Sequence, residues 1–222
     1  MRLSLAPAAA LVALAGLLTA PATAHAQERD PVLFVHGYSG NAANWDSMIS
    51  DFTDGGWERD RLHAIDYDDD ASNTETAELI AREVDAILAG TGADAVDIVT
   101  HSMGGLSSRW YLKVLGGHED VDHWISLAGP NEGSSVRLPC VTTSPSCQEV
   151  VEGSDFLQEL NTGDPTPGDT AYTTFRSFCD LIVRPSTNVT LAGADNRLVG
   201  CVSHTAFLRD DDVSEDVRDV LS

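Results

Sequence analysis

Basic residues are scarce in this chain of 222 residues. Only 13 lysine and arginine residues stand against 35 aspartate and glutamate residues, and the formal net charge at pH 7 is −22. So large a negative charge opposes binding to nucleic acids and to anionic membrane surfaces, and we expect neither as a partner. An acidic surface that keeps the protein in solution explains the charge. Tolerance of high salt, which would screen the repulsion among carboxylates, is a second interpretation.

No second long apolar run follows the one at residues 3–20. That run comes after a positively charged start and before Ala-His-Ala at residues 24–26, which is the pattern of a secretory signal peptide and its cleavage site. An uncleaved membrane anchor is the alternative. We expect residues 1–26 to be removed, leaving residues 27–222 as a single secreted domain with a net charge of −23 and no stable membrane insertion.

The C-x-x-C motif of many zinc and redox sites is absent, although the chain has four cysteines. In an oxidising compartment four cysteines favour two disulfides. Three pairings are possible, and we favour Cys140 with Cys147 and Cys179 with Cys201 over crossed arrangements. In the chain-entropy model these loops contribute about 2.5 and 3.4 kcal/mol to stability.

Apolar patterns predict strands that alternate with helices. The predicted strands are residues 31–35, 61–67, 95–101, 121–128, 170–179 and 188–192. The predicted helices are residues 41–52, 72–89, 103–115, 154–160 and 213–221, the second of them opened by a capping box of Ser72 and Glu75. The alternation predicts an α/β fold with a mostly parallel sheet of about six strands, helices on both faces and an insertion at residues 132–170.

Residues 95–105 hold the most informative pattern in the chain. A β-branched apolar run ends at Ser102 and passes directly into small residues and a helical pattern. A strand, a sharp turn and a helix in this order form a nucleophile elbow, which lifts the serine hydroxyl clear of the sheet and leaves the next N–H, that of Met103, to stabilise an oxyanion. Gly104 suits the tight turn, and Thr100 occupies the position of the first glycine of G-x-S-x-G.

A serine hydroxyl needs a base that accepts its proton. Behind an elbow of this kind the partners follow in the order serine, acid, histidine. His204 comes after the candidate acids and near the end of the chain, whereas His118 and His123 come before them. We therefore predict that His204 is the base.

Two aspartates compete to orient that base. Asp180 and Asp195 each follow a predicted strand. A disulfide between Cys179 and Cys201 would draw the loop of Asp180 towards the loop of His204, and we therefore favour Asp180 over Asp195.

A second oxyanion donor is expected in the loop after the first buried strand. His36, Gly37 and Tyr38 occupy this loop, and the backbone N–H of Tyr38 is the candidate. A lone His36 is more typical of a structural residue than of a catalytic one.

With these motifs the chain resembles the small secreted α/β-hydrolase lipases of bacteria, the class 2 lipase family that includes the lidless lipase of bacilli and its actinobacterial relatives. The resemblance rests on Val35-His36-Gly37, residues 101–105, Tyr172-Thr173, residues 180–183 and Ser-His-Thr around His204. It implies a compact α/β-hydrolase fold and a triad of Ser102, Asp180 and His204. The family usually has alanine at the position of Thr100.

Together the residues and the resemblance predict a secreted serine carboxylester hydrolase, a triacylglycerol lipase or esterase that acts through an acyl-enzyme. We expect a monomer that meets a lipid or other ester substrate, including substrate at an oil–water interface. The alternatives are a polyester or cutin-type hydrolase, a phospholipase with the same triad, or a non-catalytic binding protein on a hydrolase scaffold. No cofactor or metal is expected, since the acidic runs at residues 68–70 and 210–212 lack calcium-ligand spacing and suit solvated loops and helix N-termini.

Overall fold

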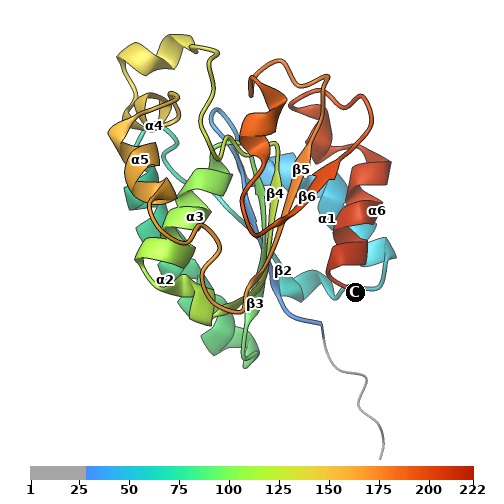
Figure 1. Cartoon of the computed structure of the whole chain (residues 1–222). Coiled ribbons are helices and arrows are strands. Elements are labelled where there is room, and N and C mark those ends of the chain that lie inside the picture. The colour runs from blue at the N-terminus through green and yellow to red at the C-terminus, as the bar shows by residue number, and fades with distance from the viewer. Residues whose placement is uncertain (1–28) are drawn as a thin grey trace, which may run out of the picture.

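A six-stranded sheet forms the middle layer of the structure, a computed structural model that describes residues 29–222 (Figure 1). The predicted signal peptide, residues 1–26, lies outside the described residues. The strands are β1 (Val32–Val35), β2 (Leu62–Ile65), β3 (Val96–His101), β4 (Val121–Leu127), β5 (Ala171–Arg176) and β6 (Asp195–Leu198). Their order is β2-β1-β3-β4-β5-β6, and each neighbouring pair is parallel. The predicted α/β fold with a parallel sheet is therefore confirmed.

Helices cover both faces of this sheet (Figure 1). On one face α1 (Asp46–Asp54) packs beside α6 (Asp211–Val220), and on the other α2 (Asn73–Thr91) packs beside α3 (Gly104–Val114). Two short helices, α4 (Pro145–Glu149) and α5 (Asp155–Asn161), lie in the insertion. The 3-10 helices are η1 (Ala42–Trp45), η2 (Arg59–Arg61), η3 (Gly117–Glu119), η4 (Pro139–Thr142), η5 (Ser186–Val189) and η6 (Ala206–Leu208).

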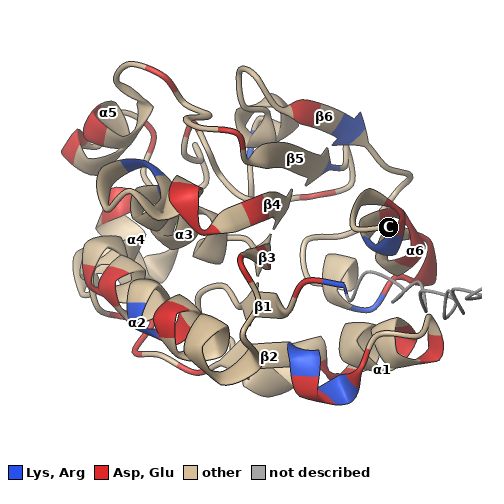
Figure 2. Cartoon of the chain, turned by 90° about the horizontal axis from the view of Figure 1, so that it is seen from below, with Lys and Arg blue, Asp and Glu red and all other residues tan. Residues whose placement is uncertain are grey.

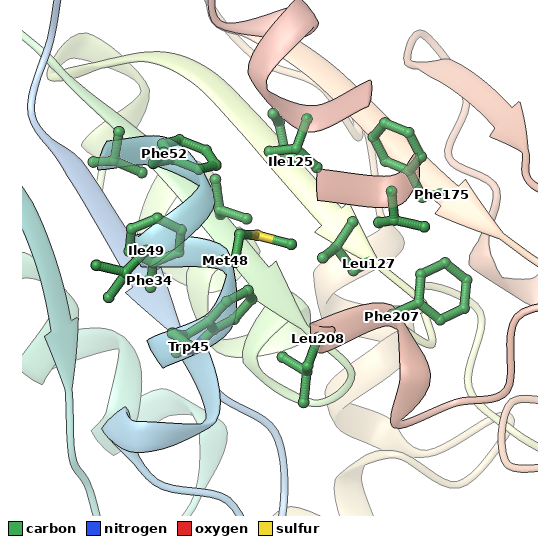
Figure 3. Close-up of a cluster of buried hydrophobic side chains, with 14 of the residues drawn as sticks. Phe34, Trp45, Met48, Ile49, Phe52, Ile125, Leu127, Phe175, Phe207 and Leu208 are labelled. Carbon is green, nitrogen blue, oxygen red and sulfur yellow. The ribbon is translucent and has the colours of Figure 1, made fainter. Parts of the chain in front are cut away.

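The sequence of β1 is apolar throughout because the strand is buried on both faces of the sheet. Val32 and Phe34 join the core on the α1 and α6 face, while Leu33 and Val35 join the core on the α2 and α3 face. All four side chains are fully buried. Figure 3 shows the first of these cores, where Phe34 lies among aromatic and aliphatic side chains from α1, β4, β5 and η6. A strand buried on both faces has no polar positions, and the run at residues 31–35 follows from that.

The sixth strand differs from the prediction. Residues 188–192 were predicted as a strand because they are apolar, but they begin in η5, and the buried Val189 and Leu191 pack as part of an irregular segment. The strand that pairs with β5 is instead β6, which is mostly polar and exposed. An edge strand with one solvated side carries no apolar run, so the pattern gave no sign of it.

The start of α2 also departs from the predicted capping box. Ser72 caps the helix by accepting the N–H of Thr74 at 3.1 Å. The carboxylate that completes the cap comes from Glu149 at the end of α4, which accepts the N–H of Asn73 at 2.7 Å and the hydroxyl of Ser72 at 2.6 Å. Glu149 therefore takes the part that the sequence assigned to Glu75, and it ties the insertion to α2.

The insertion has a small core of its own. Phe156, Leu157 and Leu160 of α5 pack with Met103 and Leu106 at the start of α3. A disulfide joins Cys140 to Cys147 within this region. The insertion is therefore anchored directly beside the turn that carries Ser102.

The carboxyl ends of β1 and β3 lie side by side, with Val35 opposite Thr100. The chain leaves β1 for β2 on one side and returns through α2 to β3 on the other, so the strand order reverses between them. In open α/β sheets ligands bind in the crevice at such a reversal. The topology thus brings the loop after β1 and the turn after β3 to one place.

Carboxylates are spread over α1, α2, α5 and α6, and basic residues are few (Figure 2). Asp210 caps α6 by accepting the N–H of Val213 at 3.1 Å, and Asp211 and Asp212 follow in its first turn. The acidic run at residues 210–212 thus supplies helix N-terminal charge, as predicted. Within residues 29–222, none of the helices combines the length and the apolar character needed to cross a bilayer.

Candidate active site

Ser102 occupies the sharp turn between β3 and α3. Its φ of 52° lies in the left-handed region, which residues other than glycine rarely adopt. Its N–H donates to the carbonyl of Leu127 on β4 at 2.9 Å. A Cβ at Gly104 would lie 2.4 Å from the carbonyl oxygen of His36 and 2.7 Å from that of Val35, so only glycine lets α3 begin this close to β1. This strained strand-turn-helix has the geometry of a nucleophile elbow.

Thr100 is accommodated beneath the turn. Its side chain is fully buried, and its hydroxyl donates to the carbonyl of Ile125 on β4 at 3.1 Å. A Cβ at Gly105 would meet Thr100 Oγ1 at 3.5 Å, an ordinary contact distance. The hydroxyl is therefore satisfied, and the larger side chain leaves the elbow intact.

Three side chains from separate loops form one hydrogen-bonded chain. Ser102 Oγ lies 2.8 Å from Nε2 of His204, and Nδ1 of His204 lies 2.8 Å from Oδ2 of Asp180. Because a carboxylate only accepts, Nδ1 carries the proton and Nε2 is left to accept the serine hydroxyl. The structure thus brings together Ser102, His204 and Asp180, which the sequence placed at distant positions.

Asp180 is almost fully buried at the end of β5. Burial raises the pKa of its carboxyl, but the hydrogen bond from His204 and those from the N–H groups of Ile182 (2.8 Å) and Val183 (3.1 Å) outweigh it. The net pKa lies below the usual value, and the group is a carboxylate at neutral pH. A fixed negative charge therefore faces the imidazole of His204.

Asp195, the alternative acid, has different surroundings. It opens the edge strand β6, its side chain is 58% exposed, and its Oδ2 accepts Nε of Arg197 at 2.8 Å. The Nδ1 of His204 is bonded to Asp180 instead.

His101, the residue before Ser102, contacts both the backbone and the ring of His204. Its Nε2 lies 2.8 Å from the carbonyl oxygen of His204, and the two ring centroids are 4.8 Å apart. Burial, together with the nearby His204, lowers the pKa of His101 to about 3. The ring is therefore neutral, and it can donate Nε2–H to that carbonyl without adding positive charge beside the base.

The loop after β1 lies against the nucleophile. A Cβ at Gly37 would be 2.8 Å from Cβ of Ser102, so this contact exists only because the side chain is missing. Tyr38 follows Gly37, and Met103 is the residue before the first turn of α3, where backbone N–H groups have no intrahelical acceptor. Tyr38, Ser102 and Met103 line one pocket.

The acidic run at residues 68–70 was predicted to be a solvated loop, and this is only partly correct. Asp69 accepts the N–H of Ser39, whose φ is 59°. Asp70 accepts the hydroxyl of Tyr38 at 3.0 Å. Two of its carboxylates thus hold the loop after β1 in place.

The loops of Asp180 and His204 are joined by two links. A disulfide connects Cys179 to Cys201. Two residues before Cys179, the buried Ser177 accepts the N–H groups of Cys179 (3.1 Å) and Val202 (3.0 Å). Its hydroxyl donates to the carbonyl of Gly200 at 2.8 Å. The carboxylate and the imidazole are thereby held in one rigid arrangement.

A narrow apolar pocket opens beside Ser102. Its walls include Pro130 after β4, Leu138 and Val150 of the insertion, and Ile182 and Val183 beyond Asp180. Its cavity volume is about 30 Å³. Within the described part of the chain, no group of three or more His, Cys, Asp and Glu side chains could hold a metal ion.

Sequence reasoning gave no role to Ser177, to the carboxylates of Asp69 and Asp70, or to His101, although His101 stands in the elbow motif. Each acts through a partner far away in the chain. For Ser177 the nearest signal is its place two residues before a cysteine expected to form a disulfide.

The profile of the family described as "Lipase (class 2)" matches residues 29–199. A triacylglycerol lipase of Burkholderia plantarii is 29% identical over 73% of the chain and 42% of its own length. A triacylglycerol lipase of Pseudarthrobacter phenanthrenivorans is 28% identical over 65% of the chain and 41% of its own length. The chain thus spans less than half the length of these curated relatives.

Solved structures share the fold. The mature form of Bacillus licheniformis lipase BlEst2 superposes with a TM-score of 0.76 at 18% identity, over 88% of this chain and 93% of that one. Lipase B of Aspergillus fumigatus gives a TM-score of 0.74 at 19% identity, over 87% of this chain and 52% of that one.

Proposed function

The chain belongs to the class 2 lipase family and has the α/β-hydrolase fold, and on these premises we propose that it is a serine carboxylester hydrolase, a triacylglycerol lipase or esterase. The observation that carries the proposal is the hydrogen-bonded chain from Ser102 through His204 to Asp180, which ends on a serine at a strained elbow. Its relatives named triacylglycerol lipase support the substrate class.

In the proposed reaction Ser102 Oγ attacks the ester carbonyl carbon while Nε2 of His204 takes the hydroxyl proton. Collapse of the tetrahedral intermediate breaks the bond to the alcohol, which leaves with that proton and leaves the acyl group on Ser102. Water then attacks the acyl carbon and gives a proton to His204. The second collapse releases the acid, and Ser102 regains its proton.

Asp180 serves the base in both halves of the reaction. Its carboxylate holds the Nδ1–H tautomer, and its charge stabilises the imidazolium that forms in each transition state. The N–H donors around Asp180 keep it ionised, which supports this role.

The oxyanion of each intermediate would accept hydrogen bonds from the backbone N–H groups of Tyr38 and Met103. Backbone donors on a loop and a helix start that are already fixed need no reorganisation as charge develops. Removing one such donor typically costs about 2.7–4 kcal/mol in the barrier. The carboxylates of Asp69 and Asp70 stabilise the loop that carries Tyr38.

A series of nitrophenyl esters from short to long acyl chains, together with emulsified triglyceride, tests the proposal. We expect the wild type to hydrolyse esters and Ser102→Ala, folded by circular dichroism, to have lost nearly all activity. Equal activity of the two proteins would contradict it. Activity on polyester or phospholipid with none on acylglycerols would keep the triad and replace the substrate class.

Export as a monomer is part of the same proposal. Two disulfides favour an oxidising compartment. The mass of protein recovered from culture medium should match a chain that begins at Gln27, and its sedimentation should give one chain. A mass that includes residues 1–26 would contradict cleavage.

A further inference from the structure

A second pocket lies on the other side of Tyr38 from the narrow apolar pocket. It encloses about 520 Å³ and is formed by the loop after β1, the start of α1 and the segment that follows His204. Apart from Tyr38 the two pockets have no lining residue in common. Neither the insertion nor the loop of Asp180 contributes to the larger one.

The second pocket is lined by neighbours of Ser102 and His204 rather than by these two residues themselves. Gly37, which lies against Ser102, and His101, which precedes it in the chain, both line the pocket. Thr205, the residue after His204, also lines the pocket. In the proposed reaction His204 must protonate the departing alcohol, so the alcohol lies on the His204 side of the scissile bond. The apolar pocket, with Met103 and Pro130, is left for the acyl chain.

The lining of the larger pocket is mixed, with Ala43 and Leu208 beside several polar groups, and its charges are balanced. Hydroxyl or amide groups come from Ser39, Asn44, Ser47 and Thr205. Asp46 brings one carboxylate and Arg209 one guanidinium. These groups offer donors and acceptors together, as a neutral molecule with several hydroxyls requires.

We propose that this pocket is the alcohol subsite of the enzyme and that it takes a neutral polyol, so that the preferred substrate is a partial glyceride with a short acyl chain and free glycerol hydroxyls. The inference rests on the proposed ester hydrolase function. The small volume of the apolar pocket accounts for the short acyl chain, and the hydroxyl, amide and charged groups of the larger pocket account for the hydroxylated alcohol.

A phosphate-bearing alcohol fits this surface less well. Arg209 is exposed and is the single cation in the lining, and Asp46 lies in the same pocket. The chain as a whole carries a formal charge of −22, which repels an anionic group approaching the site. A neutral polyol is repelled neither by the carboxylate of Asp46 nor by the negative charge of the chain.

Glyceryl monobutyrate and propyl butyrate test this inference, because they share the acyl chain and the three-carbon alcohol skeleton and differ by two hydroxyls. Release of butyric acid is titrated at constant pH. We expect kcat/KM of the wild type to be about tenfold higher for glyceryl monobutyrate. Ser47→Leu, a change at an exposed α1 position that fills the pocket, should lower this ratio about fivefold or more.

Ser50→Leu is the matched control, since Ser50 is an exposed serine of the same helix outside the pocket lining, and it should keep the wild-type ratio. Equal kcat/KM for the two esters in the wild type, or an unchanged ratio in Ser47→Leu, would overturn the inference. Faster hydrolysis of a butyryl lysophosphatidylcholine than of glyceryl monobutyrate would overturn it in favour of a phosphodiester alcohol. If neither butyrate is hydrolysed while longer nitrophenyl esters or triglyceride are, the inference fails and the ester hydrolase function stands. If no ester is hydrolysed, both fail, whereas hydrolysis without preference removes the subsite alone.

Discussion

The two aspartates near the base differ at the scale of single residues. Asp180 is buried, ionised and bonded to His204, whereas Asp195 is exposed and bonded to Arg197. In the proposed reaction a buried carboxylate that holds one tautomer of the imidazole acts in every turnover, and an exposed carboxylate paired with an arginine does not.

Asp180→Asn should therefore lower kcat by up to about 10⁴ while the fold survives, because an amide at this position favours the wrong tautomer of His204. The measurement is nitrophenyl butyrate hydrolysis with thermal unfolding as a check on the fold. Asp195→Asn, the matched control, should retain near-normal kcat. The reverse result would move the role of the acid to Asp195.

Residues that belong to a local motif could be predicted from the sequence, and residues that act through distant partners could not. Ser102 stands in an elbow pattern, and His204 follows from the order of the partners along the chain. Ser177 bonds to residues about 25 positions away, and Asp69 bonds to a loop about 30 positions away. Such contacts depend on how loops meet in space, which a pattern of neighbouring residues does not record.

At the scale of elements, the loops after β5 and β6 form one unit. Cys179 with Cys201 joins these loops beside Asp180 and His204, whereas Cys140 with Cys147 closes a short loop within the insertion. The two disulfides therefore separate an effect on catalytic geometry from an effect on stability alone.

Replacing both Cys179 and Cys201 by alanine should reduce the free energy of unfolding by about 3.4 kcal/mol in the chain-entropy model and also lower kcat. Replacing Cys140 and Cys147 should cost about 2.5 kcal/mol and leave kcat for nitrophenyl butyrate largely intact. Urea unfolding measures the free energy of unfolding, and initial rates of nitrophenyl butyrate hydrolysis measure kcat. If the variant that lacks Cys140 and Cys147 loses more kcat than the variant that lacks Cys179 and Cys201, the link between the Cys179–Cys201 disulfide and the triad is contradicted.

Element prediction succeeded where burial imposes a strong pattern. β1 is wholly apolar, and β3 and β4 have apolar residues at several buried positions, because the sheet is covered on both faces. β6 was missed because it is a polar edge strand, and the irregular segment around Val189 was mistaken for it because its side chains are buried. The cap supplied by Glu149 was missed because it crosses between α4 and α2.

At the scale of the whole molecule, acidic groups gather at the end of the sheet away from the active site. Burial, with the nearby charges of Asp97 and Asp122, raises the pKa of Asp30 to about 6. A hydrogen bond between His123 Nδ1 and Asp97, 2.9 Å long, raises the pKa of His123.

The raised pKa values of Asp30 and His123 both make the folded protein less stable as pH rises. Between the ordinary aspartate pKa of 3.8 and the folded pKa of about 6, folded Asp30 holds a proton that the unfolded chain has released, so stability falls as pH rises through this window. The contribution of His123 is complete below its unfolded pKa of about 6.5 and is lost as pH rises through its higher folded pKa.

Asp30→Asn should therefore raise the melting temperature at pH 7 and have little effect at pH 4, which flattens the pH profile. Glu78→Gln, a change at an exposed acid of α2, is the control and should leave the slope unchanged. A melting temperature of Asp30→Asn that stays parallel to the wild type from pH 4 to pH 8 would show that this group does not act as described.

Salt should stabilise the molecule at neutral pH. Raising ionic strength from 0.1 to 1 M shortens the Debye length from about 10 to about 3 Å, which screens the repulsion among carboxylates distributed over the surface (Figure 2). The melting temperature and activity at pH 7 should hold or rise, and the effect should shrink at pH 4, where many carboxylates are protonated. A steady fall of both with added salt at pH 7 would contradict this.

The central claim is that Ser102 is a nucleophile activated by His204 and Asp180. Labelling of the folded wild type with a fluorophosphonate, followed by intact mass and peptide mapping, tests it most directly. The account predicts a single adduct on Ser102, none on Ser102→Ala and much slower labelling of His204→Ala. No adduct on the folded wild type, or an adduct on another serine, would contradict the account.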